Sequence, residues 1–137
     1  MSFPSFSNDL FVVTVNGRII TNWGETATPF TDEPIDAKSI LRRGQGGNAV
    51  RIDRTNPGRR VNLFLNPGSP DSAFMQALFN SNANIVTTTQ QIGTIEAAIG
   101  TEGVIVNDAS NGRAGSTISD DNYIIEHNTW NAMKGGG

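Results

Sequence analysis

Cysteine is absent from the chain, and histidine occurs once, as His127. Without thiolates the protein forms no disulfide, and with one imidazole it lacks the ligands that transition-metal sites normally use. Apolar runs are short as well, and a run such as Leu10 to Val13 is far below the roughly 20 residues that span a bilayer. We therefore expect a protein that is made in the cytosol and has no membrane anchor, metal or cofactor.

Catalytic motifs are also missing. On a strand, Glu126 and His127 point to opposite faces, so they cannot form a local acid–base pair, and we expect an ordinary exposed or hydrogen-bonded histidine. No Gly-x-Ser-x-Gly nucleophile motif occurs. The glycines of residues 44–47 precede a strand-like run, whereas phosphate-binding loops precede a helix. The sequence therefore predicts that the protein is not an enzyme.

Residues that form strands and turns are what the sequence has in quantity. Of its 137 residues, 36% are hydrophobic, only 17% are charged and 15 are glycine. Glycine and asparagine supply the positive φ angles of tight turns, whereas a helical bundle would need more Leu, Ala, Glu and Lys. The length fits one domain, residues 1–137, and the composition favours a mainly β fold.

Alternating apolar and polar residues predict several strands. The pair Asn16-Gly17 between two such runs is a strong hairpin signal, because a type I′ turn needs positive φ twice. In the run 49–54 we expect Val50 and Ile52 to point inward, and we expect Pro34 at the start of a strand or on an edge. The nine predicted strands are 10–15, 18–23, 33–41, 49–54, 59–66, 85–92, 94–99, 104–109 and 123–130.

One segment has a helical pattern instead. Ser69 can cap a helix, Pro70 suits its first turn and Asp71 suits the positive end of its dipole. Met75 and Phe79 then contribute to one apolar face. The predicted fold is an antiparallel β-sandwich or partly closed barrel with one flanking helix over residues 70–79.

Charge is unevenly distributed along the chain. Residues 38–60 hold seven Lys or Arg and one acid, Asp53, whereas both flanking segments are acidic and the formal net charge is −3. Such a basic segment could pair locally on a solvated surface, or bind a ligand or nucleic acid. It could also meet an acidic segment of a second copy, and a head-to-tail contact of this kind builds rings or open stacks.

Taken in order, these features resemble the tail tube proteins of contractile-tailed bacteriophages, over essentially the whole chain. The most characteristic part is Val-x-Val-Asn-Gly followed by an aromatic residue. The segments that carry the resemblance are Val13 to Gly24, Asp36 before the Gly-rich hairpin, Arg59 to Leu65, the Ser69 to Phe79 helix and the closing strand Ile124 to Trp130.

The resemblance implies a virion structural protein, assembled in the host bacterial cytoplasm, that forms hexameric rings stacked into a hollow tail tube. Its implied partners are further copies of itself, a sheath protein, and baseplate and tail-terminator proteins. DNA would pass through the lumen without specific binding, because a lining of acids and neutral polar groups repels phosphates. Edge-to-edge pairing of subunits would remove exposed sheet edges.

The resemblance also suggests interface residues. A long hairpin, residues 40–50 within the basic segment, would reach a neighbouring ring. Two phenylalanines of an N-terminal arm, residues 1–9, lie in a Ser/Pro segment that cannot easily form its own core, and we expect a neighbour to bury them. We expect residues 134–137 to form a flexible glycine tail. The expected interface residues are Arg42, Arg43, Gly44, Gln45, Gly46, Gly47, Asn48, Phe3 and Phe6.

Other functions remain open at this stage. A head-decoration, tail-completion or baseplate tube-initiator protein would come from the same kind of particle, and a secretion-system inner tube protein would share its architecture. A carbohydrate-binding β-sandwich is the alternative from another class. It would be monomeric and would keep Trp23 or Trp130 exposed for stacking on a sugar.

Overall fold

The computed structural model describes the chain except for residues 1–10, 54–56, 84, 94, 111 and 135–137. Within the described part, strands dominate and one helix is present, so the prediction of a mainly β fold with one helix is confirmed. In chain order the elements are β1 Phe11–Val15, β2 Arg18–Ile20, β3 Phe30–Pro34, β4 Ser39–Arg43, β5 Ala49–Asp53, β6 Arg59–Leu65, α1 Pro70–Asn80, β7 Val86–Ile92, β8 Glu96–Ser110 and β9 Asp121–Lys134.

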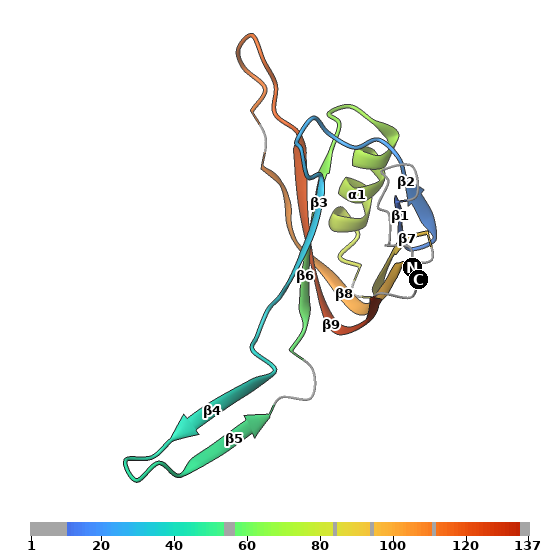
Figure 1. Cartoon of the computed structure of the whole chain (residues 1–137). Helices are drawn as coiled ribbons and strands as arrows, with labels where there is room; N and C mark the ends of the chain where they lie inside the picture. Colours follow the sequence, from blue (N-terminus) through green and yellow to red (C-terminus); the bar gives the residue numbers. More distant parts are fainter. Residues whose placement is uncertain (1–10, 54–56, 84, 94, 111, 135–137) are drawn as a thin grey trace, which may run out of the picture.

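Seven strands form one antiparallel sheet in the order β2-β1-β7-β8-β9-β6-β3. The sheet curls into a half-barrel whose concave side holds α1, while β4 and β5 form a separate ribbon that projects from one end (Figure 1). The expected sandwich or partly closed barrel is thus one strongly curved sheet with a helix in its hollow.

The first hairpin is confirmed. Asn16 and Gly17 have φ angles of 50° and 85°, the left-handed pair that a type I′ turn requires. The side chain of Asn16 also accepts a 2.9 Å hydrogen bond from the backbone N–H of Thr87, which ties the turn to the start of β7.

The helix prediction is confirmed as well. Ser69 caps α1, since its side chain accepts a hydrogen bond from the Ser72 N–H, and Pro70 is the first helical residue. On the concave side of the sheet, α1 contributes Met75 to a core whose strand residues alternate along β6 and the first half of β9. The buried hydrophobic residues are Val13, Val15, Ile20, Phe30, Val61, Leu63, Leu65, Met75, Val86, Ile95, Ile105, Tyr123 and Ile125.

The prediction of two strands at 94–99 and 104–109 is wrong, because β8 is one strand of 15 residues. No strand was predicted over residues 100–103, which contain both glycines. Instead, Glu102 adopts a φ of 53°, and β8 inserts one extra residue between Gly100 and Gly103 relative to β7. This is a β-bulge, which lets a strand continue while it bends.

The two glycines of β8 are required by the side chains of β9. A Cβ on Gly100 would lie 2.6 Å from the Trp130 ring, and a Cβ on Gly103 would lie 2.5 Å from the His127 ring. The Gly103 position would also approach the backbone carbonyl oxygen of Val86 to 2.6 Å, and a backbone atom cannot give way cheaply. Glycine here allows three strands to approach around two large rings.

The predicted strand at 33–41 is divided into two. β3 ends at Pro34, on an edge of the sheet as expected, and pairs with β6. Ile35 and Asp36 then bond through their N–H groups to Gly58 and Pro57 across the base of the projecting ribbon. The next strand, β4, begins at Ser39 and belongs to the ribbon. The alternating sequence pattern therefore continues across two strands of different sheets.

The expectation that Val50 and Ile52 point inward is also wrong. Their exposed fractions are 62% and 51%, because the β4–β5 ribbon lies away from the curved sheet and neither of its faces meets the core (Figure 1). Alternation identified the strand correctly but carried no information about what its apolar face packs against.

Replacing Gly103 with alanine is expected to destabilise the fold, by about 1–3 kcal/mol, because the new methyl group would meet the His127 ring and the Val86 carbonyl. Gly112→Ala is the control, since a Cβ there would have its nearest neighbour at 3.8 Å. Thermal unfolding of both variants measures the difference. Equal melting temperatures for the two variants would contradict the assigned role of Gly103.

Candidate assembly interface

The β4–β5 ribbon has two distinct faces. Ile40 pairs with Ile52, and Arg42 pairs with Val50, so these four side chains share one face. Directly opposed residues of an antiparallel pair point the same way, and their chain neighbours point to the other side. The other face carries Ser39, Leu41, Arg43, Ala49, Arg51 and Asp53.

The face with Ile40, Val50 and Ile52 is called the aliphatic face below. All three side chains are at least half exposed, and the row is β-branched throughout. A two-stranded hairpin is at best marginally stable in water, and a contiguous apolar surface of this kind marks an interaction site. Covering the aliphatic face would remove all three side chains from water.

The predicted interface residues 42–48 do form the tip of this ribbon. Gly44 and Asn48 close it through a 2.7 Å bond from the Gly44 N–H to the Asn48 carbonyl, and Gly47 has the positive φ of 84° that the turn needs. The structure thus places Arg42, Arg43 and the five loop residues together. Phe3 and Phe6 lie outside the described residues.

The basic segment has two parts that behave differently. At the base of the ribbon the arginines are paired: Arg59 with Asp32, and Arg60 with both Glu33 and Glu126. The hydrogen bonds to Glu126 and Glu33 raise the pKa of Arg60. Local pairing, one of the three interpretations of the sequence, therefore accounts for the base.

Near the tip, charge remains uncompensated. Arg51 pairs with Asp53 on its own strand, but no carboxylate in the described part of the chain forms an ion pair with Arg42 or Arg43. These two arginines are exposed beside the aliphatic face. The tip combines apolar and cationic groups that an acidic partner surface would complement.

The opposite end of the molecule carries an aromatic pocket. Phe11, Trp23 and Phe30 form a cluster with ring centroids 5.5–6.2 Å apart, in tilted or edge-on contacts. Residues 26–29 complete an opening of about 400 Å³. The loop 21–29 that carries most of this pocket lies at the far end of the sheet from the ribbon (Figure 1).

A carboxylate contacts the loop that lines the aromatic pocket. The carboxylate of Asp120 accepts hydrogen bonds of 3.1 and 3.2 Å from the backbone N–H groups of Glu25 and Thr26. These bonds fix the loop, and a Cβ on Gly24 would collide with the same carboxylate. The side chain of Glu25 itself is exposed. Asp120 therefore contacts Thr26 of the pocket lining, and Glu25 is the residue before Thr26 in the chain.

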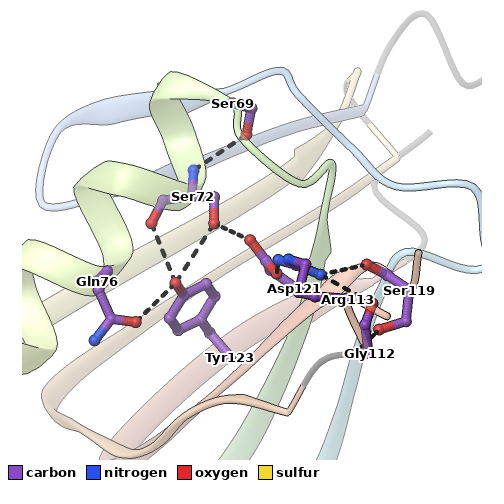
Figure 2. Close-up of polar contacts among 8 residues, drawn as sticks. All are labelled: Ser69, Ser72, Gln76, Gly112, Arg113, Ser119, Asp121 and Tyr123. Atoms are coloured by element: carbon purple, nitrogen blue, oxygen red, sulfur yellow. Dashed lines mark hydrogen bonds and ion pairs between the residues drawn. The ribbon is translucent and has the colours of Figure 1, made fainter. Parts of the chain in front are cut away.

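A buried polar network holds the β8–β9 turn near this end (Figure 2). Asp121 accepts hydrogen bonds from Ser72 of α1 and from Arg113 of the turn. Tyr123 donates a hydrogen bond of 3.2 Å to the Ser72 carbonyl. Ser72 thus lies next to a carboxylate, but His127 bonds elsewhere, so the described residues do not complete a nucleophilic triad here.

The second tie between helix and sheet is Asp71. Its carboxylate accepts 2.8 and 2.9 Å bonds from the N–H groups of Thr21 and Asn22, and a 2.8 Å bond from Arg18. Burial acts to raise the pKa of Asp71, but these three donors outweigh it and the pKa lies below its ordinary value. Sequence reasoning assigned Asp71 only to the helix dipole and missed this clamp.

His127 is fully buried and hydrogen-bonded, one of the two ordinary roles expected of it. Its Nε2 lies 2.9 Å from the hydroxyl of Thr88, and its ring packs on Trp130 with centroids 5.9 Å apart. Burial lowers its pKa. No group of three or more metal-ligating side chains occurs among the residues that the structure describes. The histidine is therefore part of the packing between β7, β8 and β9.

Neither tryptophan forms an open stacking platform. Trp23 is half-buried against Phe11 and Phe30, and Trp130 is half-buried between His127 and the guanidinium of Arg59. This placement disfavours the carbohydrate-binding alternative. The aromatic pocket and the carboxylate that contacts its loop were not predicted, because Glu25 and Asp120 are 95 positions apart and no local pattern links them.

No protein-family model matches the sequence, and no curated protein matches it. The fold, however, is similar to solved structures. One is described as the sheath/tube terminator, in the extended state, of an extracellular contractile injection system, PVC, with a TM-score of 0.62 and 13% identity over 96% of this chain and 98% of that chain.

Two further structures are similar at the same level. The cap of the anti-feeding prophage, described as the AFP tube terminating cap, has a TM-score of 0.59 and 12% identity over 98% of this chain and 93% of that one. A structure described as the sheath–tube complex of PVC in the extended state has a TM-score of 0.59 and 14% identity, covering 95% and 92%. These likenesses extend over nearly the whole chain and show its fold.

In the monomeric protein, the backbone amides of the ribbon are expected to be less protected from hydrogen exchange than those of the central strands of the sheet. Its strands have one neighbour each and bury no side chain, whereas β6 and β9 lie inside the sheet. Hydrogen–deuterium exchange of dilute protein will show fast exchange over residues 39–53 and slow exchange over 59–65 and 121–127. Equal protection of both regions would contradict the assignment of the ribbon as a surface without a packing partner in the isolated chain.

Stability is expected to fall as the pH is lowered from 7 to 5. Burial lowers the pKa of His127 in the folded protein, while the unfolded histidine titrates near ~6.5, so the unfolded state gains a proton that the folded state does not. The stability that comes from keeping His127 neutral is thus present above this pH and lost below it. The melting temperature will fall as the pH is lowered from 7 to 5, and it will fall less in the His127→Gln variant. Asp71 also contributes to stability, because its pKa is lowered in the folded protein, but that contribution is lost only below about pH 4.

Proposed function

We propose that the protein is a structural subunit of a contractile tail-like assembly, and that it builds the inner tube by stacking in rings. The observation that carries this proposal is the projecting ribbon, whose aliphatic face and unpaired arginines lie at one end of a half-barrel. A monomeric function gives no reason for such a surface. A head-to-tail contact between copies, repeated, gives a tube.

The similar structures support this function. Two are described as parts of an extracellular contractile injection system, namely a sheath/tube terminator and a sheath–tube complex, and the third is described as a tube terminating cap. A virion tail tube, as the sequence suggested, and the tube of an injection system share this architecture. Both would require the same partners, namely further copies of the subunit, a sheath around the tube, and a baseplate and terminator at its ends.

The sheet edges support lateral assembly into a ring. In the described part of the chain, β2 and β3 are the two edge strands, and each pairs on one side only. An unpaired edge is a template for another strand, and closure into a continuous barrel would cover it. Six copies per ring, as the resemblance implies, would place the convex side of each sheet toward a common axis.

The convex side of the sheet is suited to line a channel. Its only cation on β6, Arg60, is neutralised by Glu33 and Glu126, and its other side chains on β6 and β9 are mostly uncharged, such as Asn62 and Ile124. A surface without free positive charge does not hold phosphates. DNA or another polyanionic cargo would therefore slide through without specific binding.

A second candidate is the terminator ring that ends such a tube, because two of the three similar structures are described as a terminator or a cap. The two functions differ in stacking. A tube subunit adds ring upon ring without limit, whereas a terminator adds a single layer to an existing tube. Electron microscopy of the purified protein at rising concentration distinguishes them, since the first gives hollow tubes of uniform width and the second gives isolated rings.

Stacking is expected to need the cationic tip. Arg42→Gln with Arg43→Gln removes two units of positive charge from a chain of net charge −3, and we expect single rings or monomers in place of stacked rings. The matched control is Lys134→Glu, which changes the net charge equally but lies on β9 outside the ribbon. Tubes are counted in negative-stain images. Normal tubes from the double variant would show that the ribbon tip is not part of the stacking interface.

A further inference from the structure

We propose that the ribbon of one copy docks by its aliphatic face on the aromatic pocket of a second copy, with Arg42 meeting Glu25 next to the pocket lining. This inference rests on the proposed function and names the surface that receives the ribbon. The pocket, lined by Phe11, Trp23 and Phe30, would be filled by aliphatic side chains of the neighbouring subunit.

The two surfaces lie at opposite ends of the same subunit. β3 begins at Phe30, a wall of the pocket, and ends at Pro34, from which the chain leads into the ribbon. Five extended residues span on the order of 16 Å, and the ribbon then points further away (Figure 1). A subunit therefore cannot fill its own pocket with its own ribbon. The contact joins unlike surfaces of two copies, which is the condition for open stacking.

The apolar parts of the two surfaces match. The pocket is bounded by three aromatic rings and by Pro29 and Ala27, and its volume is about 400 Å³. The ribbon offers three adjacent β-branched side chains with exposed fractions of 51–62%. Burying such side chains against aromatic rings contributes roughly 25 cal/mol for each Å² removed from water.

The charges match as well. Glu25 precedes Thr26 of the pocket lining, and Asp120 accepts hydrogen bonds from the backbone N–H groups of both residues. Arg42 lies on the aliphatic face itself, while Arg43 lies on the reverse face one residue closer to the tip. Opposite charges around an apolar contact steer the encounter and fix its orientation. A contact between the ribbons of two copies would bring these arginines together, and repulsion between their charges disfavours it.

Disulfide trapping tests the contact directly, because the natural chain contains no cysteine. Arg42→Cys and Thr26→Cys are made in separate proteins, mixed at a concentration where rings stack, and oxidised. Cysteines bridge only when their Cα atoms approach within about 7 Å. We expect a cross-linked heterodimer from this mixture. Arg42→Cys mixed with Ala77→Cys, an exposed position on α1, is the control and will give none.

The N-terminal segment is the competing occupant, since residues 1–10 directly precede Phe11 at the pocket. Phe6→Cys mixed with Thr26→Cys, and the two changes combined in one chain, report this alternative. A disulfide with Phe6→Cys, in either form, and none with Arg42→Cys would overturn the proposal. So would the absence of any heterodimer from proteins that still form tubes.

Charge exchange provides a second test that separates the proposal from the function on which it rests. Arg42→Glu with Arg43→Glu will abolish stacking, and adding Glu25→Arg will restore it, whereas adding Glu102→Arg, an exposed position on β8 outside the pocket lining, will not. Loss of stacking without rescue by Glu25→Arg leaves the ribbon in the interface but refutes this pocket as its receptor. If the unaltered protein forms neither rings nor tubes at any concentration, the proposed function fails.

Discussion

The close approach of β8 and β9 around His127 is the constraint on which the rest of the structure depends. The imidazole is fully buried, and it fits only because Gly100 and Gly103 leave their side of the ladder empty. The bulge at Glu102 lets β8 continue past this point, so that two long strands run through the whole sheet and curve with it. A break here would give two short hairpins, and the two ends of the molecule would no longer be held by one rigid element.

Two buried carboxylates fix the helix within this curved sheet. Asp71 binds β2 and the chain after it, and Asp121 joins α1 to the β8–β9 turn. Both have partners for their charge, so burial is compensated. The same ties hold the loop ends that form the aromatic pocket, because Asp120 is adjacent to Asp121 and orients the loop at Glu25. Helix anchoring and the shape of the candidate receptor surface are thus coupled through two neighbouring aspartates.

The sequence predicted correctly those features that depend on residues close together in the chain. The turn at Asn16-Gly17 and the cap at Ser69 were correct, because φ preferences and capping bonds act within a few residues. The predicted gap between two strands at Gly100 and Gly103 was wrong, since the need for these glycines arises from His127 on another strand. The direction of Val50 was wrong for the same reason: alternation reports that one face is apolar and not what covers it. The ribbon tip was located by its residues, whereas the pocket loop and Asp120 are positions that only folding brings together.

The curved sheet and its helix are packed together, whereas the β4–β5 ribbon packs on neither, and this difference bears on assembly. If the ribbon packed on its own sheet, its aliphatic face would be satisfied and no energy would remain for a neighbour. Because it is held away from the core, the free energy of burying Ile40, Val50 and Ile52 is released only when another surface covers them, which in the proposed assembly is a second copy. The uncompensated arginines keep two ribbons apart and leave an acidic surface as the better partner. In the proposed assembly, such a subunit would fold alone through its curved sheet, and its remaining apolar surface would then drive association in one direction.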